Sequence, residues 1–435
     1  MDGTAFPAAD QPDRMSRDEL RALQVARLRW SLERAKRVPL FQHRLAAAGV
    51  AETDVGSIDD IARLPFVKKA DLRDNYPDRL FAVPREQIVR LHASSGTTGK
   101  PIVVAYTRHD LEVWTEVMAR TLAYAGVGSS DTVQNAFGYG LFTGGLGAHY
   151  GAERLGATVV PTSGGNTDRQ LTVLADFGVT AICATPSYFL HLVDRAESLG
   201  IDLPALPLRK GIFGAEPWSE AMRQRIERAA GIEAFDIYGL SEIIGPGVAA
   251  ESREHDGLYV FEDHFLPEIV DPESGEVLPE GEVGELVITT LSKEALPLIR
   301  YRTGDVTALV DQPGDGGRSF RRIRRISRRT DDMLIIRGVN VYPSQIEAAL
   351  LAVEGTLPHY QIVLRREVDL DQLDVQIEAE PQVLEYSEAH SRLLTALEQT
   401  IRSVVGIRAR VEVLPPQTLP RSEGKAKRVI DRREQ

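Results

Sequence analysis

Cysteine is almost missing from this chain: Cys183 is the only one among 435 residues, so no internal disulfide can form. It stands in the apolar run at 180–184, a pattern typical of a small buried residue. No apolar stretch approaches the roughly 18 residues that a membrane span needs, and residues 1–13 lack the charged-then-apolar pattern of a signal peptide. These absences predict a protein of the reducing cytoplasm with no membrane partner.

Positive charge is also in short supply. Lysine and arginine total 51 against 63 aspartates and glutamates, which gives a net charge of -12 and a pI near 5.4. A broad basic surface for nucleic acid is therefore absent, although a local basic site could still bind a small anion. With 43% hydrophobic residues, the chain is long enough for two or three domains with full cores. Small substrates fit this composition better than polymers.

Short β-rich runs alternate with helix-length segments between about residues 88 and 240. The runs lie at 132–136, 157–160, 180–184, 211–213 and 234–238. This alternation predicts a parallel sheet covered by helices. Upstream, Ser16 with Glu19 three residues later is a capping-box signature, which predicts a helical lead-in.

The pattern changes twice in the second half of the chain. Closely spaced strand patterns at about 257–310 predict an antiparallel or β-barrel-like subdomain. After Arg329, a strand, a helix from Pro343, two strands, a helix near 387–404 and a last strand predict a small α+β unit. The fold class is therefore α/β, with a large N-terminal domain at 1–329, whose helix-covered sheets are mainly parallel, and a small C-terminal domain at 330–435.

The run Ser94-Ser95-Gly96-Thr97-Thr98-Gly99-Lys100-Pro101 concentrates hydroxyls, glycine amides and one lysine. Such groups can surround phosphate oxygens. A Walker loop is excluded, because only two residues separate Gly96 from Gly99 and a proline follows Lys100. Taken alone, the run is either a phosphate-binding loop or a polar linker.

Further segments follow in order: GAEPW at 214–218, DIYGLSE at 236–242, YRTGD at 301–305, TDDMLIIRGVNVYPSQIE at 330–347 and PRSEGK at 420–425. With the run at 94–101, they resemble the adenylate-forming (ANL) superfamily. FGYGLFTGGLGAHYG at 137–151 and DGLYVFEDHFLPEIVDP at 256–272 resemble its phenylacetate-CoA ligase branch. The resemblance covers the chain from about residue 20 to its end.

The resemblance implies a two-step reaction. A carboxylate attacks the α-phosphorus of ATP to give an acyl-adenylate and pyrophosphate, and coenzyme A then displaces AMP to form a thioester. The small domain is expected to swing about Asp331 between the two steps, because Lys425 must serve adenylation and then leave. Gly338 would approach the pantetheine arm in the acceptor tunnel.

The resemblance also assigns residues, with Lys425, Glu242 and Thr97 as the catalytic ones. Glu242 would hold Mg²⁺, Tyr238 would stack on adenine, and Asp305 and Arg329 would contact the ribose. The full set expected to bind ATP is Ser94, Ser95, Gly96, Thr97, Thr98, Gly99, Lys100, Gly214, Ala215, Glu216, Asp236, Ile237, Tyr238, Gly239, Ser241, Asp305, Arg329 and Lys425. Without the family context, Asp305 reads as a turn residue and Lys425 as a surface lysine.

The aryl group is expected to lie against aromatic and small residues, namely Phe137, Tyr139, Phe142, Gly144, Gly145 and Ala215. Flat walls and glycine-lined space would suit an aromatic ring, yet the aromatics could equally pack a strand and turn. The expected substrate is phenylacetate or a benzoate that carries amino or hydroxyl groups. The sequence does not choose between them.

The sequence departs from the phenylacetate-CoA ligase branch at two places, one that concerns a structural zinc and one that concerns the acceptor of the acyl group. Many relatives bind a structural zinc through cysteines, but this chain has Ser252 and the segment 313–317 there, so no zinc is expected. Seven arginines at 318–329 favour a solvated face, with an anchor for coenzyme A phosphates or a carrier protein as the alternative. Two other functions stay open, namely transfer to a carrier protein or small nucleophile, and a non-catalytic nucleotide sensor. A homodimer also stays open.

Overall fold

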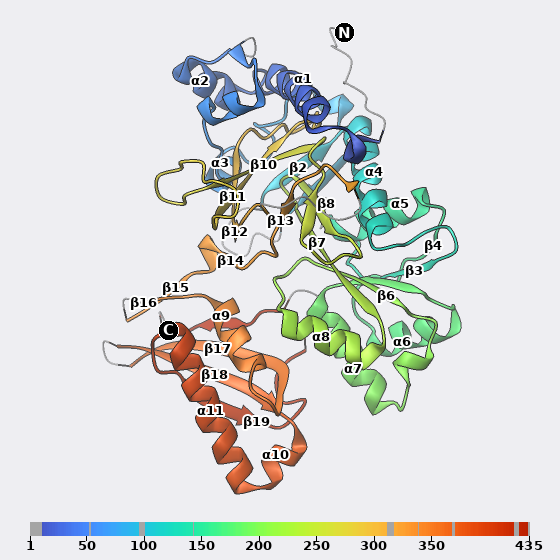
Figure 1. Ribbon diagram of the computed structural model, residues 1–435, viewed down its shortest axis with the longest axis vertical. Coiled ribbons are helices and arrows are strands. Elements are labelled where there is room, and N and C mark those ends of the chain that lie inside the picture. The colour runs from blue at the N-terminus through green and yellow to red at the C-terminus, as the bar shows by residue number, and fades with distance from the viewer. Residues whose placement is uncertain are drawn as a thin grey trace.

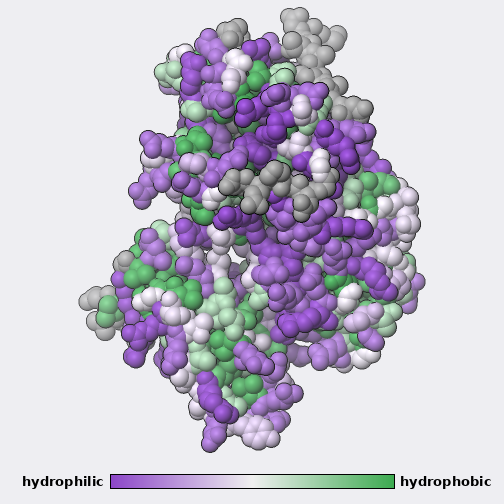
Figure 2. Space-filling model, in the orientation of Figure 1, coloured by the Kyte–Doolittle hydropathy of each residue, from purple (hydrophilic) through white to green (hydrophobic). Residues whose placement is uncertain are grey.

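A computed structural model describes residues 11–51, 54–94, 101–141, 143–310, 317–337, 339–367, 370–421 and 426–433. Figure 1 shows a large body that contains the N-terminal and central segments, and a C-terminal lobe (orange to red) beside α8. In the same orientation, Figure 2 shows a largely hydrophilic surface, with several hydrophobic patches over the C-terminal lobe. Within the described part of the chain, no helix is both long and apolar enough to span a bilayer.

The centre of the body is an eight-stranded sheet with the order β13-β9-β8-β7-β6-β5-β3-β4. Five of its strands run parallel, and they are β3 (Thr132–Asn135), β4 (Thr158–Val160), β5 (Ala181–Ala184), β6 (Lys210–Phe213) and β7 (Glu233–Leu240). The helices between them are α5 (Gly144–Arg154), α6 (Thr167–Asp176), α7 (Pro186–Ser198) and α8 (Glu220–Ala230). The predicted α/β fold with a mainly parallel sheet is confirmed. Cys183 on β5 is fully buried, and burial raises the pKa of its thiol to about 12.

The sheet continues in antiparallel fashion through β8 (Ile244–Glu251), β9 (Leu258–Val260) and β13 (Arg322–Ile323). A second, four-stranded antiparallel sheet contains β10 (Phe265–Val270), β11 (Gly284–Thr290), β12 (Tyr301–Thr307) and β14 (Arg328–Arg329). The expected β subdomain thus begins at β10 and not near residue 257, since β9 pairs with β8 of the large sheet.

The N-terminal segment contributes α1 (Arg17–Ala35), α2 (Pro39–Ala48), α3 (Lys69–Asp74), the hairpin β1 (Arg90–Ala93) and β2 (Val103–Tyr106), and α4 (Arg108–Tyr124). The predicted capping box before α1 is confirmed. The Ser16 side chain accepts from the N–H of Glu19, and the Glu19 carboxylate accepts from the N–H of Ser16 at 2.9 Å. Short 3₁₀ helices are η1 (Pro12–Arg14), η3 (Ile58–Arg63), η4 (Arg85–Gln87), η5 (Leu203–Ala205) and η7 (Thr330–Asp332).

The C-terminal lobe is an α+β unit, as expected. It contains β15 (Leu334–Ile336), β16 (Val339–Val341), α9 (Pro343–Leu351), β17 (Thr356–Glu367), β18 (Leu370–Ala379), α10 (Pro381–Glu385), α11 (Ser387–Val405), β19 (Arg410–Leu414) and β20 (Val429–Asp431). Its main sheet has the order β19-β18-β17-β20, with a core of its own under α9 and α11. Asp331 lies in η7, between the last strand of the body and the first strand of the lobe; its role as the hinge stays a prediction.

Candidate active site

Several residues of the expected site lie outside the described residues, namely 95–100, Phe142, Gly338 and Lys425. Their assigned roles therefore stay predictions. The hydroxyl-rich run connects β1 and β2 of a hairpin. At the base of this connection, the Ser94 hydroxyl accepts a hydrogen bond from the N–H of Ile102 at 3.0 Å, and the Ser94 N–H donates to the Ile102 carbonyl at 2.9 Å. Ser94 thus closes the base of this connection, and its expected contact with ATP stays a prediction.

A pocket opens at the carboxyl ends of β6 and β7, where open α/β sheets usually bind ligands. Its empty volume is about 600 Å³. The predicted residues that line it are Ala215, Glu216, Asp236, Ile237, Tyr238, Gly239, Asp305 and Arg329. Predicted residues as far apart in the sequence as Ala215 and Arg329 therefore line one cavity.

Asp305 is the centre of a hydrogen-bonded trio in this pocket. The Tyr238 hydroxyl donates to Asp305 Oδ2 at 2.6 Å, and Arg329 Nη1 donates to Oδ1 at 2.6 Å. Arg329 also donates to the carbonyl of Thr303 at 3.2 Å. Burial and the Asp305 charge raise the pKa of Tyr238 well above its usual value, so the phenol remains a donor. The trio fixes an acidic group on the pocket wall, where sugar hydroxyls can be bound.

Two glycines allow the backbone to approach closely beside this pocket. A Cβ on Gly214 would come within 2.6 Å of the carbonyl oxygen of Ile237, and one on Gly239 within 2.6 Å of that of Ile244. Between these strands, Ala215 adopts a φ of 73°, a left-handed conformation that costs a non-glycine residue free energy. The GAEPW segment is therefore held in a specific shape.

Asp236 lies at the pocket floor under Trp218 and Arg325. Trp218 Nε1 donates to Asp236 Oδ1 at 3.0 Å, and Arg325 Nε lies 3.4 Å from Oδ2. Burial, with the nearby charge of Glu251, raises the pKa of Asp236 to about 7 against the opposing influence of Arg325 and Trp218. Sequence reasoning gave no role to Trp218 or Arg325, although Trp218 stands in the GAEPW segment.

Glu242 lies in the turn between β7 and β8, and only 6% of its surface is exposed. Across the residues that the structure describes, its carboxylate takes part in no hydrogen bond or ion pair. Buried carboxylates are normally paired, because desolvating an uncompensated charge is costly. The Glu242 side chain therefore fits a ligand of a hard cation, for which carboxylate oxygens are preferred.

The segment expected to hold the aryl group packs against the start of α5. The Tyr139 hydroxyl accepts from Asn135 Nδ2 at 2.7 Å and lies 3.1 Å from His149 Nδ1. Burial raises the pKa of Tyr139 to about 12. A Cβ on Gly145 would lie 2.6 Å from the carbonyl oxygen of Gly138. The space beside Gly145 is thus filled by backbone, contrary to the expectation that this glycine opens the cavity.

Phe137 and Gly144 pack together in the same segment. Phe137 is buried in the main core, and a Cβ on Gly144 would meet the Phe137 side chain at 3.6 Å, an ordinary contact distance. The packing interpretation of Phe137 therefore has support from the structure, while an aryl contact stays a prediction.

The arginine-rich segment is not a solvated face. Six of its seven arginine side chains have a partner among the residues that the structure describes. The pairs are Arg318 with Glu254, Arg321 with Glu262, Arg322 with Asp256, Arg325 with Glu220, Arg329 with Asp305, and Arg328 over the ring of Tyr342 in the C-terminal lobe. The sequence expectation missed these partners because the acids come from distant segments. Of these arginines, Arg325 and Arg329 line the pocket.

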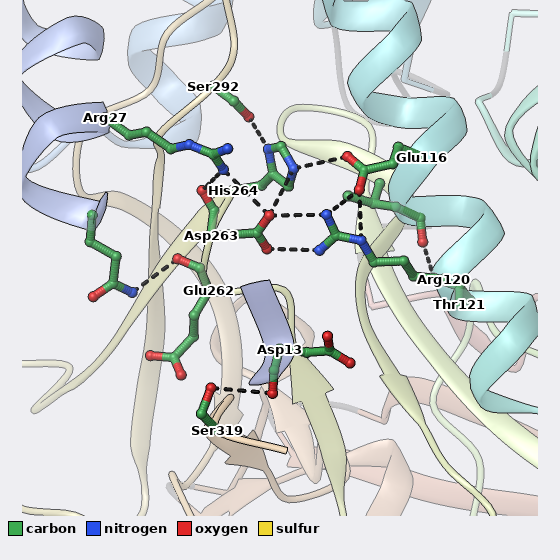
Figure 3. Close-up of polar contacts among 12 residues, drawn as sticks. Asp13, Arg27, Glu116, Arg120, Thr121, Glu262, Asp263, His264, Ser292 and Ser319 are labelled. Atoms are coloured by element: carbon green, nitrogen blue, oxygen red, sulfur yellow. Dashed lines mark hydrogen bonds and ion pairs between the residues drawn. The ribbon is translucent and has the colours of Figure 1, made fainter. Parts of the chain in front are cut away.

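The acidic residues near the missing zinc ligands belong to a buried ionic network (Figure 3). Asp263 lies between Arg27 and Arg120, and His264 contacts Ser292 and Glu116. Burial alone would raise the pKa of Glu116, but His264 and Arg120 lower it to about 2. In the described ranges, no group of three or more His, Cys, Asp or Glu side chains is arranged to hold a metal ion. The absence of zinc stays a prediction.

Family models match both parts of the chain. The model of the AMP-binding enzyme matches residues 22–292, and that of the AMP-binding enzyme C-terminal domain matches residues 338–433. The chain is 52% identical to phenylacetate-coenzyme A ligase of Pseudomonas putida, with 98% of this chain and 97% of that protein covered. It is 51% identical to the enzyme of that name from Thermus thermophilus, with 96% and 98% covered.

Solved structures agree with this assignment. A 2-hydroxyisobutyryl-CoA ligase in its postadenylation state, in complex with 2-HIB-AMP, is 30% identical and superposes with a TM-score of 0.91, covering 100% of this chain and 95% of that chain. The same ligase in its thioesterification state gives 0.71 at the same coverage. The arrangement of body and lobe in the present chain is therefore more similar to the first of these structures than to the second. The chain belongs to the AMP-binding enzyme family, the adenylate-forming superfamily, and within it to the phenylacetate-CoA ligase branch.

Proposed function

We propose that this protein activates phenylacetate with ATP to phenylacetyl-adenylate and then transfers the acyl group to coenzyme A. The observation that carries the proposal is the 50–52% identity to phenylacetate-coenzyme A ligases over nearly the full length of both chains. Such identity spans the nucleotide pocket, the aryl segment and the C-terminal lobe together. It favours phenylacetate over a substituted benzoate and coenzyme A over a carrier protein.

In the first step, the nucleotide occupies the pocket at the ends of β6 and β7. The ribose hydroxyls donate to Asp305, which Tyr238 and Arg329 hold in place. The adenine lies between Tyr238 and the segment 214–216. The connection between β1 and β2 surrounds the β- and γ-phosphates. The carboxylate oxygen of phenylacetate attacks the α-phosphorus, pyrophosphate leaves, and Lys425 stabilises the charge that both anions bring together.

Glu242 is the residue that would hold Mg²⁺, because it is a buried glutamate whose carboxylate has no hydrogen-bond or ion-pair partner in the part of the chain that the structure describes. When bound, the ion would neutralise phosphate charge. Glu242 itself contributes a fixed anionic ligand at the edge of the pocket.

In the second step, the thiol of coenzyme A loses its proton and attacks the acyl carbonyl carbon, so that a carbon–sulfur bond forms and AMP leaves. The lobe must first move, because Ala426 and Arg428 lie against the body in the present arrangement. The Ala426 N–H donates to Glu216 Oε2 at 3.0 Å, and Arg428 Nη2 donates to Ser187 Oγ at 2.8 Å. Rotation about the segment that contains Asp331 would break both contacts and bring Gly338 to the pantetheine arm.

The proposal is tested by pyrophosphate exchange into ATP with a panel of acids: phenylacetate, benzoate, 2-aminobenzoate and 4-hydroxybenzoate. Exchange should depend on the acid and be fastest with phenylacetate. Addition of coenzyme A should then release AMP and form one thioester for each AMP. Absence of exchange with every acid would contradict the enzymatic proposal, and faster exchange with a benzoate would contradict the substrate assignment.

A further inference from the structure

Lys293 is a buried cation in the loop between β11 and β12, and only 3% of its surface is exposed. Among the residues that the structure describes, its ammonium group bonds no carboxylate. Instead, Lys293 Nζ donates to the carbonyl oxygen of Ile243 at 2.6 Å and to that of Glu242 at 3.2 Å. Both carbonyls belong to the turn that carries the Glu242 side chain. Lys293 therefore fixes the backbone next to the proposed cation ligand, although 50 residues separate it from Ile243 in the sequence.

The loop that presents Lys293 is fixed on both sides of this residue. On one side, the Asp110 carboxylate accepts from the N–H groups of Glu294 at 2.6 Å and Ala295 at 3.0 Å. On the other, the Ser292 hydroxyl lies 2.7 Å from His264 Nδ1, within the buried ionic network (Figure 3). The residues on both sides of Lys293 are thus held by hydrogen bonds, so the position of its Cα is fixed.

The turn at Glu242 is also supported by two aromatic residues, Tyr106 at the end of β2 and Trp114 in α4. Lys293 Nζ lies 4.7 Å from the ring centroid of Tyr106, which stacks on Trp114. Trp114 Nε1 donates to the carbonyl oxygen of Pro246 at 2.9 Å, just beyond the turn. Hydrogen bonds from Lys293 and Trp114 therefore fix the backbone on both sides of Ile244. The charge of Lys293 also lowers the cost of burying Glu242, whose carboxylate has no hydrogen-bond or ion-pair partner among the described residues.

We propose that Lys293 is a positioning residue of the nucleotide site, which fixes the turn at Glu242 so that its carboxylate meets the metal–phosphate group of ATP. The inference rests on the proposed function. The alternative is a role in folding alone, in which Lys293 only balances the buried charge of Asp110. The two roles have different consequences for metal dependence.

The test replaces Lys293 by Met, which keeps the length and the apolar stem but loses both hydrogen bonds. ATP binding is measured by titration calorimetry with Mg²⁺ and with EDTA, without any acid substrate. In the wild type, Mg²⁺ should tighten ATP binding. In Lys293→Met, we expect this tightening to fall by at least tenfold, while binding in EDTA changes less than threefold. Hydrogen exchange at the amides of 241–245 should be faster in the variant.

Activity gives an independent readout. Pyrophosphate exchange should fall at least 100-fold in Lys293→Met, whereas thioester formation from synthetic phenylacetyl-adenylate should fall less than threefold. Lys293→Arg should recover most of the Mg²⁺ effect, because a guanidinium can donate to two carbonyls. If Lys293→Met does not fold, Lys293→Gln replaces it, since its shorter amide cannot reach both carbonyls.

The matched control is Lys210→Met, which removes another partly buried lysine and its contact with Asp131 at 3.0 Å, at the start of β6. It should lower the melting temperature but leave the Mg²⁺ effect unchanged. An unchanged Mg²⁺ effect and unchanged exchange at 241–245 in Lys293→Met would overturn the inference. A wild type that binds Mg²⁺–ATP but shows no acid-dependent exchange would overturn the proposed function and leave the role of Lys293 intact.

Discussion

The carboxylate of Glu216 accepts a hydrogen bond from the backbone N–H of Ala426 at 3.0 Å, although 210 residues separate the two. Its other oxygen accepts from the N–H of Ser187, near the start of α7, at 2.8 Å. Glu216 lines the pocket proposed for the nucleotide, so one side chain links this pocket, the body and the lobe. Ala426 directly follows Lys425 in the sequence, so under the proposed function this bond would belong to the arrangement in which the lobe serves adenylation.

Replacing Glu216 by Gln should impair the first half-reaction selectively. The amide can accept only one of the two hydrogen bonds, and a bond to a charged acceptor contributes about 1.5–3 kcal/mol. Pyrophosphate exchange should fall about 10- to 100-fold. Thioester formation from preformed phenylacetyl-adenylate should stay within about threefold of the wild type, because the proposed second step requires the lobe to move away from Glu216.

The control for this variant is Glu197→Gln, which changes an exposed glutamate of α7. It should leave both half-reactions unchanged. Equal losses in the two half-reactions of Glu216→Gln would show that Glu216 acts on the fold and not on the lobe.

Asp305→Asn should weaken ATP binding and lower stability. Tyr238 and Arg329 both donate to this carboxylate, and the amide nitrogen of asparagine cannot accept either bond. The KM for ATP should rise about tenfold, and the free energy of unfolding should fall by about 1–3 kcal/mol. Steady-state kinetics and urea unfolding check the two effects. Tyr238→Phe serves as the comparison, since it should lower stability with a smaller change in KM.

Much of the fold could be predicted from local pattern. Short apolar runs such as the one that contains Cys183 become buried parallel strands, because both faces of that sheet are covered. The capping box at Ser16 and Glu19 involves four consecutive residues and is equally local. By contrast, β20 has only three residues and forms by pairing with β17, so no local signal marked it.

The residues assigned to the nucleotide were predictable by resemblance, and the contacts that support them were not. Tyr238, Asp305 and Arg329 were expected near the nucleotide, and the structure brings them together. Lys293 stands in a segment with no recognisable motif, and its role follows from contacts made across the fold. Long-range hydrogen bonds of this kind depend on packing, which local sequence patterns do not specify.

Cys183 should be unreactive in the native protein. Its side chain is fully buried, and burial raises the pKa of the thiol to about 12, so almost no thiolate forms near neutral pH. A disulfide reagent such as DTNB should release no thionitrobenzoate from the folded protein. In guanidinium chloride, the same reagent should report one thiol per chain. A fast native reaction would contradict the burial of β5.

Asp236 should make stability depend on pH. Its pKa is raised from 3.8 to about 7, by burial first and then by the Glu251 charge. The folded state therefore disfavours the charged form. The stability that this group contributes is fully present below about pH 4 and is lost as the pH rises through about 7.

The variant Asp236→Asn removes that dependence while the other groups that face it, Glu251, Arg223 and Arg325, stay. Burial would raise the pKa of Glu251, but His255 and Arg223 lower it below its usual value. Glu251 therefore acts in the opposite direction, since its contribution to stability is lost on acidification. The comparison is therefore made between wild type and variant at each pH. Melting temperatures measured from pH 5 to 8 should show Asp236→Asn gaining stability relative to the wild type as the pH rises. A constant difference across this range would mean that Asp236 is already ionised at pH 5, with Arg325 compensating its charge fully.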